Sequence, residues 1–398
     1  MSGERPRPNW LREHPRAWVA AVATVCFGAF MGQLDASVVA LTYRSIGKTF
    51  DAGLGTVQWV SLTYLLTLAL LLVPLGALSD RIGRKRVYLW GFAVFSLASL
   101  GCALAPNLLV LDGTRAVQGV GAAMLQANSV ALVATSVPRL RLRTALGVQA
   151  AAQALGLALG PTLGGLIVQT VGWRWVFGIN VPIGIAAILL GRFLLPRTRI
   201  TAGRAPGRLR AVLALPAMPR RLVGATLAYL LLFGPIVLVP TVLQRHGDSA
   251  LLAGSVVAAL PVGFALSAGL VDRLLPHSWS ARRRCVAGLA VAATGLVGLL
   301  LARTEPAGCA AAMVTIGLGV GIYTPANNTL IMGAVGPHVA APAGGLVNTG
   351  RAVGTAGGTA VVAASLGSAG GSPLALAVLL GVVIAAALTI DREPRGPA

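Results

Sequence analysis

Twelve long apolar runs dominate this sequence and constrain its fold more than any other feature. A helix that crosses a bilayer needs about 20 mostly apolar residues. The runs occupy residues 17–42, 55–78, 87–105, 108–135, 143–170, 176–195, 221–244, 249–275, 284–303, 306–334, 339–367 and 372–390. With 56% hydrophobic and only 11% charged residues among 398, the chain carries more apolar surface than one water-soluble core can bury. We therefore expect an all-α membrane protein with twelve transmembrane helices.

The longest connection between runs, residues 196–220, is rich in arginine and divides the runs into two sets of six. The sequence therefore predicts an N-terminal six-helix bundle at 1–195, a basic cytoplasmic linker at 196–220 and a C-terminal six-helix bundle at 221–398.

The net charge of +21 is distributed in a way that argues against nucleic-acid binding. Of the 32 Lys and Arg residues, 25 lie on one side of the predicted membrane and 5 on the other, while Arg115 and Arg351 lie within runs. Because positive residues collect on the cytoplasmic side, we expect a multi-pass protein of the cytoplasmic (inner) membrane with both termini in the cytoplasm.

The sequence contains no pattern typical of an enzyme, a metal site or a cofactor site. Its four cysteines lie in apolar runs without CxxC spacing, and there is no Walker loop or zinc signature. We expect no metal, no cofactor and no catalysis, so the energy for any transport must come from an ion or solute gradient. The expected partners are a small-molecule substrate, protons and the lipid bilayer, with the monomer as the functional unit.

The loop after the second run reads Gly76-Ala-Leu-Ser-Asp80-Arg81-Ile-Gly83-Arg84-Lys85-Arg86. Gly76 permits close helix contact, Gly83 permits a tight turn, and Asp80 can pair with Arg81, Arg84 or a neighbouring helix end. An ordinary positive loop would explain the arginines but not Asp80 with both glycines. The stretch resembles the cytoplasmic signature G-x-L-x-D-R-x-G-R-K of the major facilitator superfamily. That resemblance implies two six-helix bundles and a charge latch formed by Gly76, Asp80, Arg81, Gly83, Arg84 and Lys85. Gly269 to Arg273 resembles a degraded second copy.

The fifth run carries a glycine-proline motif made of Gly147, Gly156, Gly160, Pro161, Gly164 and Gly165. Gly156, Gly160 and Gly164 share one helix face, so a partner helix can approach closely, and Pro161 introduces a kink. A plain packing seam of small residues is the alternative. The spacing resembles the antiporter signature of the same superfamily, and this implies an exporter rather than an uptake symporter.

Asp35 in the first run and Arg115 in the fourth are charged residues within apolar segments, where an unpaired charge is expensive. A carboxyl group at this depth is suited to bind and release a proton, and Asp112 is the other acidic residue well inside a run. Arg115 either locks its own helix by pairing with Asp112 at i−3 or pairs with Asp35. The resemblance implies that Asp35 matches the acid of the L-D-x-T-V-V signature of multidrug exporters, although Ala40 and Arg44 depart from it. Arg115 and Gln118 match the R-x-x-Q-G pattern, whose arginine is implicated in proton transfer.

Polar and aromatic residues within the runs are candidates for the lining of a substrate cavity. They are Gln33, Trp59, Tyr64, Gln118, Gln126, Asn327, Asn328, Asn348 and Arg351. Trp59 with Tyr64, residues 172–184 and residues 348–354 resemble the drug:proton antiporter family that usually has fourteen spans. Tryptophans near run ends equally fit an interfacial belt, and Asn327 with Asn328 equally fits the cap of a broken helix.

The resemblance implies a proton-coupled efflux antiporter that exports small amphipathic or lipophilic compounds of the drug or antibiotic type by alternating access. The chain resembles a member shortened to twelve spans, because 196–220 stands where the fourteen-span relatives have two extra helices. An uptake symporter on the same fold and a non-transporting membrane receptor or scaffold remain alternatives.

Overall fold

The computed structural model describes residues 17–138, 141–196, 211–274, 276, 278–335, 340–368 and 371–390, and the regular structure in these ranges is helical throughout. The N-terminal half contains α2 (Ala17–Val38), η1 (Val39–Thr42), α3 (Tyr43–Phe50), α4 (Leu54–Val57), α5 (Trp59–Ile82), α6 (Arg84–Ala103), α7 (Leu108–Ser136), α8 (Leu142–Thr170), α9 (Arg174–Gly178) and α10 (Asn180–Leu194). The C-terminal half contains α12 (Met218–His246), α13 (Ala250–Leu274), α14 (Ala281–Ala302), α15 (Pro306–Gly333), α16 (Ala340–Gly367) and α17 (Gly371–Leu388).

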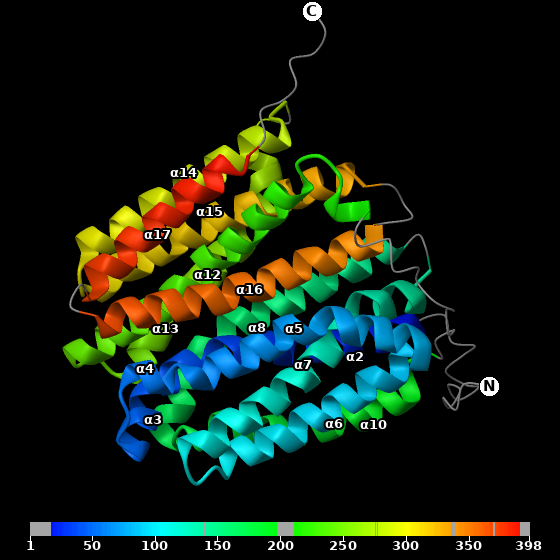
Figure 1. Cartoon of the computed structure of the whole chain (residues 1–398), viewed down its shortest axis with the longest axis horizontal. Helices are drawn as coiled ribbons and strands as arrows, with labels where there is room; N and C mark the ends of the chain where they lie inside the picture. The colour runs from blue at the N-terminus through cyan, green and yellow to red at the C-terminus, as the bar shows by residue number, and fades with distance from the viewer. Residues whose placement is uncertain are drawn as a thin grey trace, which may run out of the picture. The chain divides into compact units, whose positions relative to one another are not determined.

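Each predicted apolar run corresponds to one of these helices or to a short series of them (Figure 1). Within the described residues, ten helical segments are long and apolar enough to cross a membrane, and α8 contributes a shorter apolar stretch at Leu155–Thr170. The prediction of an all-α membrane protein is confirmed.

The first membrane segment is longer than the predicted 17–42. It extends from Trp18 to Phe50, because η1 carries the chain from α2 into α3 without a break. In α3, Tyr43 and Ile46 are buried whereas Lys48 is exposed, so this last part is amphipathic rather than apolar. A search for uninterrupted apolar residues therefore ends the segment too early.

Several helix starts follow from capping chemistry in the sequence. Asn107 accepts a hydrogen bond of 2.9 Å from the Val110 backbone nitrogen and begins α7. Glu305 accepts bonds from the Ala307 and Gly308 backbone nitrogens, and Pro306 occupies the first turn of α15. These residues satisfy backbone donors that would otherwise lack partners at the end of a helix.

The chain divides into two compact units, which we describe separately. Unit 1 comprises Met1–Arg204 and Leu243–Ala258, and unit 2 comprises Ala205–Val242 and Ala259–Ala398. Within unit 1, α2 packs on α8, α5 packs on α7, and α6 packs on both α7 and α10 (Figure 1). Within unit 2, α14 packs on α15 and α17, and α16 packs on α17.

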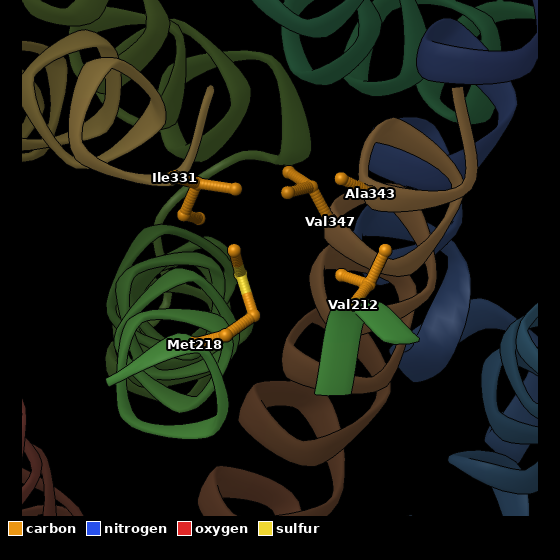
Figure 2. Packing of buried hydrophobic residues seen from close by; sticks show 5 residues of the cluster. All are labelled: Val212, Met218, Ile331, Ala343 and Val347. Carbon is orange, nitrogen blue, oxygen red and sulfur yellow. The ribbon is translucent and has the colours of Figure 1, made fainter. Parts of the chain in front are cut away.

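A hydrophobic cluster in unit 2 includes part of the predicted linker (Figure 2). Val212 and Met218 are fully buried against Ile331 of α15 and against Ala343 and Val347 of α16. Burying a large apolar side chain contributes roughly 1.5–3 kcal/mol relative to leaving it exposed. The C-terminal part of residues 196–220 thus packs in unit 2 through apolar contacts, which the basic composition of the segment does not predict.

Candidate functional site

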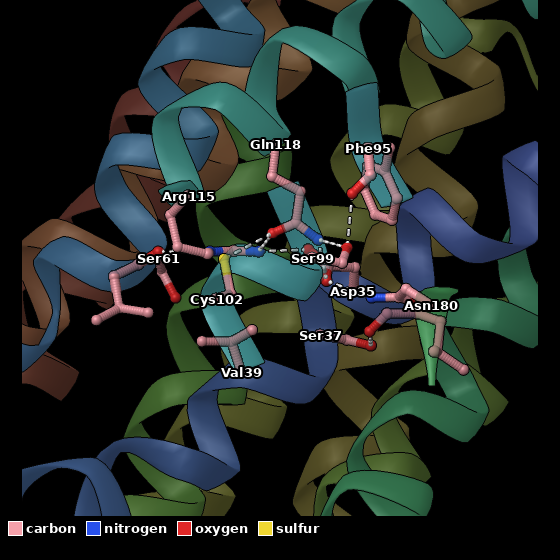
Figure 3. A network of polar contacts seen from close by, with 12 residues as sticks. Asp35, Ser37, Val39, Ser61, Phe95, Ser99, Cys102, Arg115, Gln118 and Asn180 are labelled. Atoms are coloured by element: carbon pink, nitrogen blue, oxygen red, sulfur yellow. Dashed lines mark hydrogen bonds and ion pairs between the residues drawn. The ribbon is translucent and has the colours of Figure 1, made fainter. Parts of the chain in front are cut away.

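A buried ion pair joins α2 to α7 within unit 1 (Figure 3). Oδ2 of Asp35 lies 2.6 Å from Nη1 of Arg115, and the two side chains are 0% and 1% exposed. Arg115 therefore pairs with Asp35, and the alternative of an intrahelical pair with Asp112 is wrong. Oδ1 of Asp112 has no hydrogen-bond partner among the described residues. A charged pair at this depth is tolerated because each charge is neutralised by the other.

Neutral donors complete the surroundings of the Asp35 carboxylate. Its Oδ1 accepts hydrogen bonds from Nε2 of Gln118 at 3.1 Å and from Nδ2 of Asn180 at 3.2 Å. Gln118 also accepts from Nη1 of Arg115 at 2.6 Å and donates to Oγ of Ser99 at 2.8 Å. The network therefore links α2, α6, α7 and α10 through one carboxylate. A change in the charge of that carboxylate acts on all four helices at once.

The Arg115 side chain is held by further contacts besides the carboxylate. Its Nε donates to the Val60 carbonyl oxygen at 2.8 Å, and its guanidinium carbon lies 4.2 Å from the Tyr64 ring centroid and 5.5 Å from that of Phe177. Aromatic faces stabilise a cation most where water is excluded. Arg115 and Gln118 reach the same network because residues three apart share one helix face.

Asn180 is a site residue that the sequence analysis did not select. It is 1% exposed and opens α10, directly after α9. Two hydrogen bonds hold the segment that precedes α10. Nε1 of Trp173 donates to Oγ1 of Thr49 at 3.0 Å, and Nη2 of Arg174 donates to the Ala105 carbonyl oxygen at 2.9 Å. The signal available in the sequence was a lone amide at the start of an otherwise apolar segment.

A hollow in unit 1 is lined by three of the predicted cavity residues, Gln33, Tyr64 and Gln126. It lies between α2, α5, α7 and α8, and the described residues that line it carry no charge. The Tyr64 hydroxyl and Oε1 of Gln126 are buried without a partner among the described residues. Unsatisfied polar atoms beside a hollow are available to a ligand.

A second, smaller hollow lies within unit 2 and contains Asn327, Asn328 and Arg351. Tyr229 and Tyr323 also line it. Nδ2 of Asn327 donates to the Arg221 carbonyl oxygen at 3.0 Å, so this amide links α15 to α12.

The remaining predicted cavity residues lie elsewhere. Gln118 belongs to the ion-pair network rather than to the hollow of unit 1. Trp59 and Asn348 line neither of the two hollows described here, and Trp59 is 47% exposed.

The α5–α6 connection contains the predicted latch residues. Nη2 of Arg84 lies 2.7 Å from Oδ1 of Asp80, and Arg81 is exposed. Gly83 separates the two helices with a φ of 112°, which only glycine adopts readily. Lys85 is 3% exposed, and its Nζ donates to the carbonyl oxygens of Arg192 at 2.9 Å and Leu195 at 2.7 Å. Lys85 thereby satisfies backbone acceptors at the C-terminal end of α10.

Gly76 does not make the close helix contact that we expected. A Cβ atom at this position would lie 3.7 Å from Cβ of Ala127, which is an ordinary van der Waals separation. The space between the helices at this level is wide enough for alanine.

The glycines of the fifth run pack α8 closely on α2, the helix that carries Asp35. A Cβ atom at Gly156 would collide with the Phe30 carbonyl oxygen, and one at Gly160 would collide with Oγ of Ser37. Gly164 faces Val38 in the same way, Gly165 faces the backbone of Ala250, and Pro161 lies inside the helix. The surroundings of Gly147, and the side chains of Gly269 to Arg273, lie outside the described residues.

Comparison with known families gives one match that covers most of the chain. The family model described as the Major Facilitator Superfamily matches residues 25–359.

Several relatives carry names that refer to resistance or export. The chain is 41% identical over 203 residues to the methylenomycin A resistance protein of Streptomyces coelicolor, a match that covers 50% of this chain and 42% of the relative. It is 37% identical over 191 residues to the tetracenomycin C resistance and export protein of Streptomyces glaucescens, covering 48% and 35%. It is 39% identical over 164 residues to the multidrug resistance protein Stp of Mycobacterium tuberculosis, covering 41% and 30%. The matches thus span less than half the length of these relatives.

A solved structure of similar fold is a bacterial homolog of the human lysosomal transporter Spinster in an inward-facing, unoccupied conformation. It aligns with a TM-score of 0.68 over 95% of this chain and 96% of that chain, at 17% sequence identity. At this identity the similarity concerns the fold alone.

Proposed function

We propose that this chain, which belongs to the Major Facilitator Superfamily and is a multi-pass membrane transporter, is a proton-coupled antiporter that exports small amphipathic or lipophilic compounds. Membership of this family also places it among transporters rather than enzymes, as the sequence predicted. The relatives named for resistance support export of drug-like compounds.

The observation that carries the proposal is the buried pair of Asp35 and Arg115. In the ionised state the carboxylate accepts hydrogen bonds from Arg115, Gln118 and Asn180. Protonation of Asp35 removes the negative charge that balances Arg115 and weakens both neutral bonds, because charge-assisted hydrogen bonds are the stronger kind. The network then favours a different arrangement of its four helices, and a group that binds a proton with different affinity in two arrangements couples proton binding to reorientation.

Two further features support coupling between Asp35 and helix movement. The close seam of Gly156 and Gly160 against α2 transmits a shift of the Asp35 helix directly to α8. The Asp80–Arg84 pair and the Lys85 contacts tie α5, α6 and α10 together at the cytoplasmic end that we propose for them.

The topology forms part of the same proposal. Both termini lie in the cytoplasm, residues 1–195 and 221–398 form the two bundles, residues 196–220 connect them, and the monomer is functional. The positive-inside distribution of Lys and Arg supports this orientation.

The test uses inverted membrane vesicles with an acidic interior. Ethidium, rhodamine 6G, chloramphenicol and nalidixate sample cationic, neutral and anionic compounds. For an antiporter, an accepted compound dissipates the proton gradient as it enters the vesicle. Asp35→Asn should reduce this response by about tenfold or more, because the variant holds no titratable group in the network. Asp51→Asn is the matched control, since Asp51 ends α3 outside the network.

The outcomes separate the alternatives. With an uptake symporter, the accepted compound would leave the vesicle together with protons. With a receptor or scaffold, no compound would change the proton gradient. A full response in Asp35→Asn would refute the role of this carboxyl group.

A further inference from the structure

Arg115 and Arg351 lie inside α7 and α16, away from the helix ends, and their charges have different surroundings. Arg115 in unit 1 stacks on Tyr64 and pairs with Asp35. Arg351 in unit 2 lies over the ring of Tyr229, with its guanidinium carbon 5.1 Å from the ring centroid, but no ion pair to it is found among the described residues. Both guanidinium groups are permanently charged. The first has a counter-ion supplied by the protein, and the second has none among the residues described.

Arg351 lies far from both ends of α16. The residue lies about 16 Å along α16 from Ala340, in a helix about 42 Å long, at 1.5 Å per residue. α16 corresponds to the eleventh predicted run, although it is not among the ten segments apolar enough to cross a membrane, and the Arg351 side chain is half-buried. In a helix that spans a membrane, an arginine this far from the helix ends costs several kcal/mol unless it is paired or faces water. The contact with Tyr229 offsets part of that cost, but an aromatic face carries no net charge.

The atoms of Arg351 show where a partner would bind. Its Nε is buried and makes no hydrogen bond with described residues. The side chain lines the hollow of unit 2 together with Asn328 and Tyr229. Glu305 is the one acidic residue of unit 2 whose side chain is described, and it is occupied at the N-terminus of α15.

We propose that Arg351, with Tyr229 and Asn328, forms a subsite that binds the carboxylate, or a similar singly charged anionic group, of the transported compound. This inference rests on the proposed transport function and names the charge class of the cargo. The planar guanidinium presents paired donors that match a carboxylate, and its Nε has no hydrogen-bond partner among the described residues. A cation would be repelled here, whereas an anion would supply a counter-charge that none of the described residues gives Arg351.

The test compares acids with their uncharged amides, so that shape stays nearly constant. Benzoate with benzamide, salicylate with salicylamide, and 2-naphthoate with 2-naphthamide are titrated into the purified full chain in detergent, and binding is measured by calorimetry. We expect the acid to bind about tenfold more tightly than its amide in at least one pair. Arg351→Gln should abolish this preference. Arg351→Lys should retain part of it, since the charge remains but the forked geometry is lost.

Arg283→Gln is the matched control, because it removes the same charge from an exposed position of unit 2. The preference should persist in this variant. Equal binding of acid and amide in all three pairs would overturn the subsite, as would a preference that survives in Arg351→Gln. Size-exclusion profiles and melting temperatures establish that each variant remains folded.

The result is separable from the test of the proposed function. The preference for acids should also persist in Asp35→Asn, because Asp35 lies in unit 1. Arg351-dependent binding without gradient-driven exchange would refute the antiporter and retain the subsite. Exchange of cationic dyes by a chain that shows no preference for acids would refute the subsite and retain the antiporter.

Discussion

The guanidinium carbon of Arg115 lies 4.2 Å from the centre of the Tyr64 ring, and Tyr64 also lines the uncharged hollow of unit 1. One aromatic side chain thus contacts both the proposed proton site and the space proposed for substrate. A compound bound in the hollow can therefore affect the Asp35–Arg115 pair through its contact with Tyr64 alone.

The first prediction concerns this tyrosine. Tyr64→Phe keeps the ring over Arg115 and removes a buried hydroxyl that has no partner among the described residues, so we expect near-normal exchange and unchanged or slightly higher thermal stability. Tyr64→Leu removes the aromatic face, and in this variant protons should cross the membrane without transport of substrate. The measurement is proton leak into vesicles without substrate. Equal leak in the leucine and phenylalanine variants would contradict the proposed link.

The second prediction concerns the energetics of the ion pair. Arg115→Gln leaves the Asp35 carboxylate buried without its counter-ion, and removing one partner of such a pair costs about 3–5 kcal/mol. The double variant Asp35→Asn with Arg115→Gln should lose less than the sum of the two single variants. Reversible unfolding in mixed detergent micelles measures this coupling. Strict additivity would mean that the two residues do not interact in the membrane protein.

The third prediction tests the seam between α2 and α8. Gly156→Ala places a Cβ atom against the carbonyl oxygen of Phe30, which is backbone and cannot rotate away. We expect a loss of about 1–3 kcal/mol in unfolding free energy and a marked fall in exchange. Gly113→Ala is the control, because a Cβ atom there meets no atom within 4 Å among the described residues. Alanine at Gly113 should be neutral or stabilising by up to about 1 kcal/mol. Equal effects at the two positions would show that the seam is not a close contact.

The fourth prediction concerns Lys85. Lys85→Met preserves the length of the side chain but removes the donor to the carbonyl oxygens of Arg192 and Leu195. Leaving buried acceptors without a donor should lower the unfolding free energy by about 1–3 kcal/mol. Thermal unfolding measures the loss. Arg86→Met, the neighbouring substitution with the same loss of charge, should change the melting temperature much less. A larger fall in melting temperature for Arg86→Met than for Lys85→Met would mean that surface charge stabilises the protein more than the bonds from Lys85 to the end of α10 do.

The helices and the Asp80–Arg84 pair were largely predictable because they depend on local sequence. Apolar length predicted the helices, and ten of the resulting segments are long and apolar enough to cross a membrane among the described residues. A glycine between Asp80 and Arg84 predicted the α5–α6 turn. The end of the first segment was misplaced because α3 keeps one apolar face after the uninterrupted run has ended.

The contacts of the site were harder to predict because they join residues far apart in the chain. Asp112 and Asp35 were both possible partners of Arg115, and spacing favours Asp112 since only that pair is local. The structure selects Asp35, which lies 80 positions away along the chain. Asn180 was missed for the same reason, and Gly76 was given a packing role that its surroundings do not require.

In the proposed mechanism Asp35 exchanges its proton for substrate, so binding of substrate should release a proton from the protein. A compound accepted in the vesicle assay is added to purified protein in weakly buffered detergent solution, and the released protons are followed with a pH indicator. Wild-type protein and Asp51→Asn should release protons as the compound binds, and Asp35→Asn should release none. Release from Asp35→Asn equal to that of the wild type would contradict the account.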